Sequence, residues 1–255
     1  MPLLEVNHLT QRFGGLQALT DFNMKIEEHD LVGLIGPNGA GKTTVFNLVS
    51  GFYTPSEGSI TFAGEATRGL KPHAVTSLGM ARTFQNIRLW NDLSVLDNIR
   101  LAQTHWLGYG FLNAVLRTKK YFAAEKRIEE KSRDILEMMD LSQYAGECPK
   151  NLPYGLQRRV ELARALSTNP KLLLLDEPAA GLNSADIDGL IRYIRWIHDE
   201  FKISIWMIEH QMKVVMSLCQ RLTVIDFGRT IAVGTPDEIK ANHDVIKAYL
   251  GDDNL

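Results

Sequence analysis

The sequence predicts an α/β fold in which a buried parallel sheet is interrupted by a helical insertion. Apolar runs at 31–35, 172–175 and 203–208 have the length and continuity of strands that are buried on both faces. Helical patterns separate these runs, and a charged, helix-rich block lies between about 87 and 157. The chain of 255 residues, of which 45% are hydrophobic, is long enough for one large domain with an inserted subdomain.

The composition argues against several classes of protein. The formal net charge is −2, so the surface as a whole is not that of a nucleic-acid binder. Cys148 and Cys219 form neither a metal-binding spacing nor a disulfide framework, which is typical of a reducing compartment. The first residues lack a signal-peptide pattern, and no run approaches the roughly 20 apolar residues that cross a bilayer. We therefore expect any role at a membrane to come through a partner.

The elements before the insertion begin with an antiparallel β region. A strand pattern from Leu3 to Phe13 is broken at Gly14 and Gly15 and resumes from Phe22 to Ile26. After the buried run at 31–35 we expect a helix over 43–49, a strand over 59–63, a helix from Pro72 to Gly79 and a strand over 80–84.

A glycine-rich loop follows the strand at 31–35 and leads into a helix. It fits the nucleotide-binding pattern of Gly, four residues and Gly-Lys-Thr. Glycines allow backbone amides to approach a triphosphate, and the helix N-terminus adds free amides and the positive end of its dipole. Lys42 supplies a mobile positive charge for the outer phosphates, and the Thr43 hydroxyl suits a magnesium ligand. A chance glycine-rich turn would not require the strand before it and the helix after it. The expected nucleotide-binding residues of the loop are Gly36, Asn38, Gly39, Ala40, Gly41, Lys42, Thr43 and Thr44.

The inserted block from Asn86 to about Leu156 has a different character. Ser94 with Asp97 predicts a helix start, and a charged helix over 122–140 carries one apolar face. The segment from His105 to Leu116 is apolar and aromatic but too short to span a membrane. It is either a local packing loop or a surface that docks against another protein.

Two adjacent carboxylates, Asp176 and Glu177, end the buried run at 172–175. Carboxylates at the tip of a buried strand are costly unless a cation or a reaction uses them. Beside a phosphate loop, Asp176 can hold magnesium, directly or through water, and Glu177 can orient or deprotonate the attacking water. The alternative is an ordinary acidic loop after a strand.

Three further side chains have both an ordinary and a functional interpretation. Gln85 follows the strand at 80–84 and can reach magnesium and the attacking water, although a lone glutamine is usually a surface residue. His210 follows the strand at 203–208, at the sheet edge where α/β proteins bind ligands, and can contact the γ-phosphate. A lone histidine is more often structural. Phe13 can stack on an adenine ring, but from the residues alone a core position is favoured.

The remaining elements complete the α/β core. We expect a helix over 158–167, a helix over 185–198, and a hairpin that joins strands at 222–226 and 230–233. The chain should end in a helix from Pro236 to Leu250 and a frayed tail from Gly251 to Leu255. The predicted organisation is a single domain, with an α/β core at about 1–86 and 158–235, a helical subdomain at about 87–157, and a C-terminal helix and tail at 236–255.

Taken in order, these motifs resemble the ATP-binding subunits of ABC transporters over essentially the whole chain. The resemblance implies a P-loop NTPase core that binds ATP and Mg²⁺, with an ATPase activity that drives transport. It favours adenine stacking for Phe13 over a core position. The matching features are the Walker A loop (36–44), the Q-loop glutamine (Gln85), Walker B (172–176), the catalytic glutamate (Glu177), the D-loop (180–183) and the switch histidine (His210).

Within that family the sequence is most similar to the LivG type of branched-chain amino acid importers. The resemblance rests on 12–15, 82–86, the insert around 105–126, 176–183 and 248–251. It implies a peripheral protein at the cytoplasmic face of the plasma membrane, with two membrane permeases and, indirectly, a periplasmic or extracellular substrate-binding protein as partners, and no nucleic acid. Urea and amide importers and the lipopolysaccharide-export ATPase look similar. A soluble ABC ATPase that acts on ribosomes or DNA is less favoured, because the insert shows no sustained heptads.

One motif departs from the family pattern. The signature Leu-Ser-Gly-Gly-Gln, which caps the ATP of a partner subunit in the family's dimer, aligns with Leu152, Pro153, Tyr154, Gly155 and Leu156. Pro153 has neither a hydroxyl nor a backbone N–H. The lost hydrogen bond to a charged group costs about 1.5–3 kcal/mol if nothing replaces it. We therefore hypothesise that the chain pairs with a different, paralogous ATPase rather than with itself.

Overall fold

The computed structural model describes residues 1–104 and 108–250, which fold into two compact units. The sheet unit comprises Met1–Gln85 and Lys171–Leu255, and the helical unit comprises Asn86–Pro170. The sequence places the end of the helical subdomain near 157, whereas the helical unit continues to Pro170. Helix α6 (Tyr154–Leu166) accounts for the difference, because it packs against two other helices of that unit.

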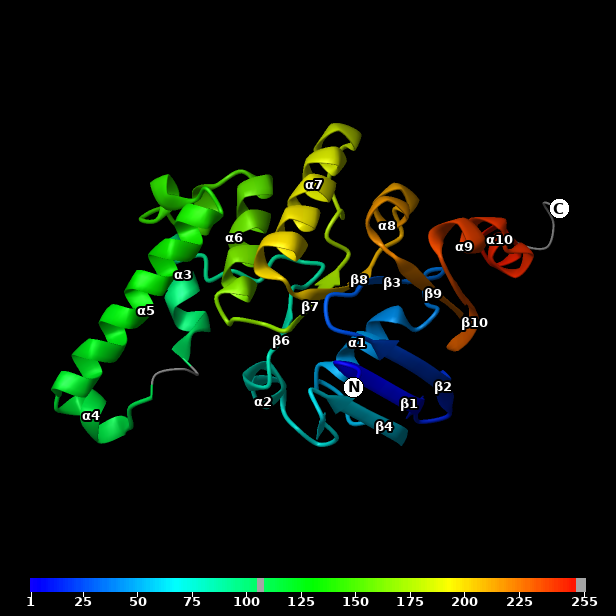
Figure 1. Ribbon diagram of the computed structural model, residues 1–255, viewed down its shortest axis with the longest axis horizontal. Helices are drawn as coiled ribbons and strands as arrows, with labels where there is room; N and C mark the ends of the chain where they lie inside the picture. The colour runs from blue at the N-terminus through cyan, green and yellow to red at the C-terminus, as the bar shows by residue number, and fades with distance from the viewer. Residues whose placement is uncertain (105–107, 251–255) are drawn as a thin grey trace. The chain divides into compact units, whose positions relative to one another are not determined.

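A six-stranded, mainly parallel sheet forms the centre of the sheet unit. Its strand order is β10-β9-β3-β8-β7-β6, and only the edge strand β10 runs antiparallel to its neighbour (Figure 1). Every residue of β3, β7 and β8 is buried, as their continuous apolar sequences predict. The strands are β3 (Leu31–Ile35), β6 (Met80–Arg82), β7 (Leu172–Asp176), β8 (Ser204–Ile208), β9 (Arg221–Asp226) and β10 (Arg229–Gly234).

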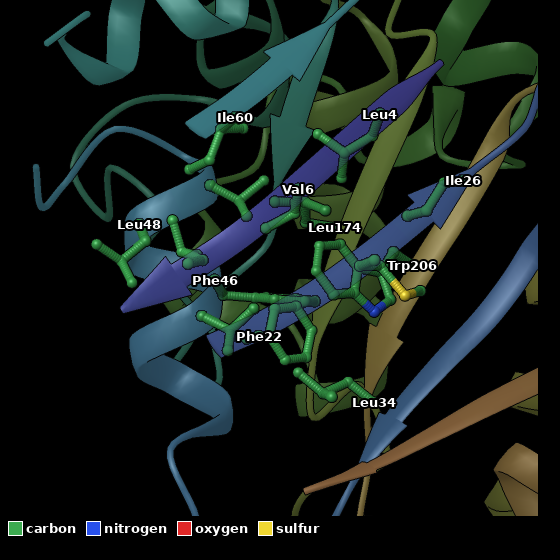
Figure 2. Close-up of a cluster of buried hydrophobic side chains, with 14 of the residues drawn as sticks. Leu4, Val6, Phe22, Ile26, Leu34, Phe46, Leu48, Ile60, Leu174 and Trp206 are labelled. Atoms are coloured by element: carbon green, nitrogen blue, oxygen red, sulfur yellow. The ribbon is translucent and has the colours of Figure 1, made fainter. Parts of the chain in front are cut away.

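A smaller antiparallel sheet, with the order β2-β1-β4-β5, carries the N-terminal strands. A hydrophobic core joins residues of both sheets and of helix α1 (Lys42–Val49) (Figure 2). Trp206 of β8 stacks on Phe22 of β2 with ring centroids 6.5 Å apart, and meets the ring edge of Phe46 at 5.0 Å. The strands of this sheet are β1 (Leu4–Phe13), β2 (Leu16–Ile26), β4 (Glu57–Phe62) and β5 (Glu65–Ala66). These observations confirm the predicted α/β fold with an antiparallel N-terminal region.

The C-terminal segment corrects one prediction, because two helices replace the single helix expected over 236–250. The break lies at Asn242, whose backbone is extended at φ −78° and ψ 121°. The Asn242 side-chain oxygen accepts hydrogen bonds from the backbone N–H groups of Asp244 (2.9 Å) and Val245 (3.2 Å), which caps the second helix. The helices of the sheet unit are α1 (Lys42–Val49), α2 (Pro72–Ser77), α7 (Ser184–Phe201), α8 (Met212–Leu218), α9 (Pro236–Ala241) and α10 (His243–Leu250).

The helical unit contains α3 (Val95–Ala102), α4 (Phe111–Val115), α5 (Lys119–Met138) and α6. Ser94 caps α3 as predicted, since its hydroxyl accepts a hydrogen bond from the Asp97 N–H at 3.0 Å. In the part of the chain that the structure describes, no helix combines the length and the hydropathy needed to cross a membrane. The predicted C-terminal tail and part of the apolar segment at 105–116 lie outside the described residues.

Candidate functional site

The glycine-rich loop lies between β3 and α1, and two of its glycines are required by the backbone. Gly36 has a φ of +151°, and a Cβ there would lie 2.0 Å from the carbonyl oxygen of Ile225. Gly41 has a φ of +105°, and a Cβ there would lie 2.8 Å from the carbonyl oxygen of Ala18. Both positions exclude other residues, so the spacing of the motif follows from the turn that the chain makes here.

Lys42 begins α1 and folds back across this loop. Its ammonium group donates hydrogen bonds to the carbonyl oxygens of Gly36 (2.7 Å) and Pro37 (2.9 Å). Burial lowers the pKa of Lys42, and the negative charges of Glu177 and Asp176 act against that shift. The cation is therefore held against the loop and close to the two carboxylates that end β7.

Asp176 is the last residue of β7, and its charge is paired inside the protein. The guanidinium of Arg82, at the end of β6, lies 2.7 Å from the Asp176 Oδ2 atom, and the two side chains are only 6% and 7% exposed. Arg82 also donates to Asn47 Oδ1 (2.8 Å) and Ser50 Oγ (2.9 Å), which lie in and at the end of α1. Arg82 thus connects α1, which follows the phosphate loop, to β7, which ends at Asp176.

Aromatic rings enclose the Arg82 guanidinium. Its central carbon lies 5.5 Å, 5.8 Å and 5.0 Å from the ring centroids of Phe46, Phe52 and Phe84. Such cation–π contacts hold the side chain in one orientation. Arg82 was not predicted as a site residue, although a charged residue within the apolar run at 80–84 was a signal of a buried partner.

Glu177, Gln85 and His210 come together at one point, although they belong to distant segments. The Gln85 side-chain amide donates to Glu177 Oε2 at 2.7 Å, and His210 Nδ1 lies 3.6 Å from the same oxygen. Glu177 itself has a φ of +48°, a left-handed conformation that is strained for a residue with a Cβ. Strand β6 ends at Arg82, so Gln85 lies three residues beyond it rather than at its end.

Glu209 connects the loops that carry Glu177 and His210. Its side chain is fully buried and accepts hydrogen bonds from the backbone N–H groups of Ala179 (2.6 Å), His210 (3.1 Å) and Gln211 (3.2 Å). Burial raises the pKa of Glu209, and these hydrogen bonds act against the shift. Glu209 was not singled out from the sequence, although a carboxylate directly after a buried run also signals a specific partner.

The phosphate loop, Gln85, Glu177 and His210 border a cavity of about 650 Å³. The C-terminal helix α10 also contributes to its wall, which the sequence analysis did not foresee. Tyr249 lies against the phosphate loop, where burial raises the pKa of its hydroxyl and a hydrogen bond from the Gly36 backbone opposes that shift. The cavity is lined by Gly36, Pro37, Asn38, Gln85, Glu177, His210, Ala248 and Tyr249.

Phe13, at the end of β1, lies outside the hydrophobic core. Its side chain is 42% exposed and meets the ring of Tyr53 edge-on, with centroids 5.3 Å apart. This excludes the core position that the residues alone favoured. An exposed, laterally supported ring suits stacking on a flat ligand.

The oxygen-bearing side chains near the loop fit a magnesium ion together with a triphosphate. Thr43 is exposed in the first turn of α1, and Asp176 and Gln85 bring a carboxylate and an amide to the same region. Among the residues that the structure describes, no group of three or more His, Cys, Asp or Glu side chains could hold a metal alone. Mg²⁺ does not need such a group, because it takes one or two carboxylates and completes its shell with phosphate and water.

The segment from Leu152 to Gly155 belongs to the helical unit. Pro153 immediately precedes α6, and its carbonyl oxygen accepts hydrogen bonds from the N–H groups of Leu156 (2.9 Å) and Gln157 (3.0 Å). The Gln157 side chain donates to the Leu152 carbonyl oxygen at 2.8 Å. Tyr154 is partly exposed, and a Cβ on Gly155 would meet open space. The segment is therefore an ordered helix start that presents no donor at Pro153.

Comparisons with known proteins show the family to which the chain belongs. The profile of the family described as "ABC transporter" matches residues 19–180, and one described as "Branched-chain amino acid ATP-binding cassette transporter" matches residues 229–254. The high-affinity branched-chain amino acid transport ATP-binding protein BraF of Pseudomonas aeruginosa is 45% identical over 251 residues, which cover 98% of each chain. The protein LivG of Salmonella typhimurium, which carries the same description, is 42% identical with the same coverage.

Solved structures also match the fold of this chain. The ADP conformation of MJ1267, an ATP-binding cassette of an ABC transporter, gives a TM-score of 0.85 at 29% identity and covers 98% of this chain and 99% of its own. The chain belongs to the ABC transporter family and is one of its ATPases, which bind ATP. Within the family it is an ATP-binding protein of the branched-chain amino acid type. The predicted family, fold class and enzyme class are thereby confirmed.

Proposed function

We propose that this ATPase energises the import of branched-chain amino acids from the cytoplasmic face of the plasma membrane. The observation that carries the proposal is the convergence of Gln85 and His210 on one oxygen of Glu177, beside the phosphate loop. A second support is the match of residues 229–254 to the branched-chain amino acid family. The assignment of substrate rests on this match and on the named relatives.

The side chains around the cavity suggest a division of roles in hydrolysis. The loop amides from Asn38 to Thr44 and the ammonium of Lys42 bind the phosphates and stabilise the charge of the transition state, which is the main source of catalysis in phosphoryl transfer. Glu177 orients the attacking water and accepts its proton. His210 donates a hydrogen bond to the developing charge, and Gln85 holds Glu177 until the nucleotide arrives. Phe13 stacks on the adenine.

Magnesium would be held by the Thr43 hydroxyl, Asp176 and the Gln85 amide oxygen. Because Arg82 engages Asp176 Oδ2, the other carboxylate oxygen is the candidate ligand. When bound, the ion supplies neutralising charge to the β- and γ-phosphates. Arg82 would act as a positioning residue, since it fixes Asp176 relative to α1, which carries Thr43.

The chain would work with two membrane permeases and a paralogous ATPase, and indirectly with an extracytoplasmic substrate-binding protein. The support for a heterodimer is the contrast between a complete phosphate site and the incomplete signature at Leu152, Pro153, Tyr154 and Gly155. The paralogue would supply an intact signature to the ATP on this chain. The site capped by Pro153 would then be the weaker of the two.

The first experiment is co-purification of the chain from its native membranes in mild detergent, with every partner identified by mass. Two permeases and a second ATPase support the proposal, whereas permeases with this ATPase alone contradict the heterodimer. Leucine uptake by the reconstituted assembly then tests the substrate. Glu177→Gln should lower ATP hydrolysis by about 10²–10⁴-fold and abolish uptake while ATP binding persists. Unchanged hydrolysis would remove Glu177 from its role.

Pro153→Ser tests the signature in the same assembly. It restores a hydroxyl and a backbone N–H, so it should tighten ATP binding at the second site. The control is Gly146→Ala, which lies in the same unit outside the signature and whose added Cβ would meet no atom within 4 Å. If the isolated chain hydrolyses ATP as a homodimer as fast as the full assembly does, the heterodimer proposal is wrong.

A further inference from the structure

We propose that the tip of the helical unit, residues 108–124, rests on the anionic headgroup layer of the membrane. The tip consists of α4, the connecting turn and the start of α5, and Figure 1 shows α4 at the N-terminal end of the long helix α5. The inference goes beyond the proposed function, because it concerns a lipid contact made by the ATPase itself.

The first observation is a concentration of exposed apolar side chains. Four large side chains of α4 and the residue after it have no cover in the described structure, and one from the first turn of α5 joins them. In α4, positions 111, 112 and 115 lie on adjoining faces of a single turn and a half. The exposed fractions are 81% for Phe111, 72% for Leu112, 60% for Val115, 71% for Leu116 and 58% for Phe122.

The second observation is the charge of the same segment. Between residues 108 and 124 the sequence contains no Asp or Glu but has Arg117, Lys119 and Lys120, all exposed. Within the described part of the chain, these three cations form no ion pair with a carboxylate. Glu125, the first carboxylate after the tip, is engaged by Arg100 (3.1 Å). The segment therefore presents a positive charge of three beside its apolar face.

The third observation is that side-chain contacts fix the conformation of the tip. The Thr118 hydroxyl donates to the Asn113 side chain at 3.0 Å, which closes the turn between the helices. The Tyr109 hydroxyl donates to Glu125 at 2.7 Å, and the Tyr109 and Tyr121 rings pack edge-on at 5.3 Å. These contacts hold the apolar residues outward in a defined arrangement, so their exposure is not that of a frayed loop.

Apolar side chains flanked by lysine and arginine are the composition of segments that lie in a membrane interface. Anionic lipids attract such cations, and the apolar face enters the headgroup boundary. A single small tip binds weakly by itself. Weak binding suffices for a subunit that permeases already hold at the membrane, where the tip would fix its orientation.

The test is co-sedimentation of the full chain with vesicles of phosphatidylglycerol and phosphatidylcholine, and with vesicles of phosphatidylcholine alone. The charge variant is Arg117→Gln/Lys119→Gln/Lys120→Gln. Its matched control, Lys202→Gln/Arg229→Gln/Lys240→Gln, removes three exposed charges from the sheet unit. We expect the charge variant to lose roughly 100-fold in apparent affinity for the anionic vesicles and the control to lose little.

The apolar variant is Phe111→Ser/Leu112→Ser, and its control, Phe227→Ser/Val233→Ser, replaces two exposed apolar residues of the sheet unit. Binding should fall in the first only, and should weaken in about 1 M salt, where the Debye length is about 3 Å. Equal losses of vesicle affinity in the charge variant and in its control, or no binding of the unaltered chain to anionic vesicles, would overturn the proposal. So would tip variants that bind vesicles normally but no longer co-purify with permeases, because the tip would then contact protein. ATP hydrolysis, measured in parallel, should not change, which separates this test from that of the proposed function.

Discussion

Replacing Arg82 with alanine tests the buried network that holds Asp176, the proposed magnesium ligand. The Arg82 and Asp176 side chains are almost fully buried and their nearest atoms are 2.7 Å apart. Removal of the cation would leave a carboxylate inside the protein without its partner, which costs about 3–5 kcal/mol in the free energy of unfolding. That is a large part of the roughly 5–15 kcal/mol that stabilises an ordinary domain.

Urea unfolding followed by tryptophan fluorescence measures this loss, since Trp206 is buried in the core of the same unit. The matched control is Lys213→Ala, which breaks an ion pair of similar length (2.6 Å) whose side chains are 54% and 52% exposed. An exposed pair contributes less than about 1 kcal/mol. Arg82→Ala should therefore lower the urea midpoint much further than Lys213→Ala.

A double-mutant cycle with Asp176→Asn isolates the electrostatic part of the effect. Asparagine keeps the shape of the side chain but removes the charge, so the double variant should be more stable than the sum of the single losses predicts. We expect a coupling energy of about 1–3 kcal/mol. A cycle without coupling, or an Arg82→Ala variant no less stable than Lys213→Ala, would refute the argument from burial.

Two further predictions concern the phosphate loop and Glu209. Gly36→Ala would place a Cβ 2.0 Å from the Ile225 carbonyl oxygen, so binding of a fluorescent ATP analogue should be lost in a titration. The control is Gly189→Ala, at an open position of α7, which should leave binding intact and stabilise the fold by about 0.5–1 kcal/mol. Normal ATP binding by Gly36→Ala would contradict the loop geometry. Burial raises the pKa of Glu209 above its ordinary 4.5, so its contribution to stability is complete below pH 4.5 and is lost as the pH rises through the raised value. Glutamine cannot ionise, so Glu209→Gln should make the free energy of unfolding depend less on pH in this range. If the unfolding free energies of the two proteins vary equally with pH, Glu209 does not cause the dependence.

Local sequence was sufficient for the elements whose pattern has a direct physical cause. The continuous apolar runs predicted β3, β7 and β8, because strands buried on both faces must be apolar throughout. The loop from Gly36 to Thr44 was recognisable because its glycines and lysine carry the chemistry in a single short segment. Gln85, Glu177 and His210 were also predicted as site residues, and the structure brings these three side chains together.

The residues that the sequence analysis missed act through partners far away in the chain. Arg82 meets Asp176 across a separation of 94 residues, and Glu209 meets the Ala179 backbone across 30. No local periodicity reports such pairs. The break at Asn242 was missed for a different reason, since the apolar spacing continues through it and only the capping bonds of its side chain reveal the second helix.

The strained backbone of Glu177 and the buried carboxylate of Glu209 are linked by hydrogen bonds. A left-handed conformation costs a non-glycine residue about 1–3 kcal/mol and persists only where neighbours enforce it. Here the Glu177 N–H is held by the Ile208 carbonyl oxygen at 2.9 Å, and two residues later the Ala179 N–H is held by Glu209. Glu209 also holds the N–H of His210, so the loops after β7 and β8 are joined by one side chain. A displacement of His210 would therefore be transmitted through Glu209 to the segment that carries Glu177.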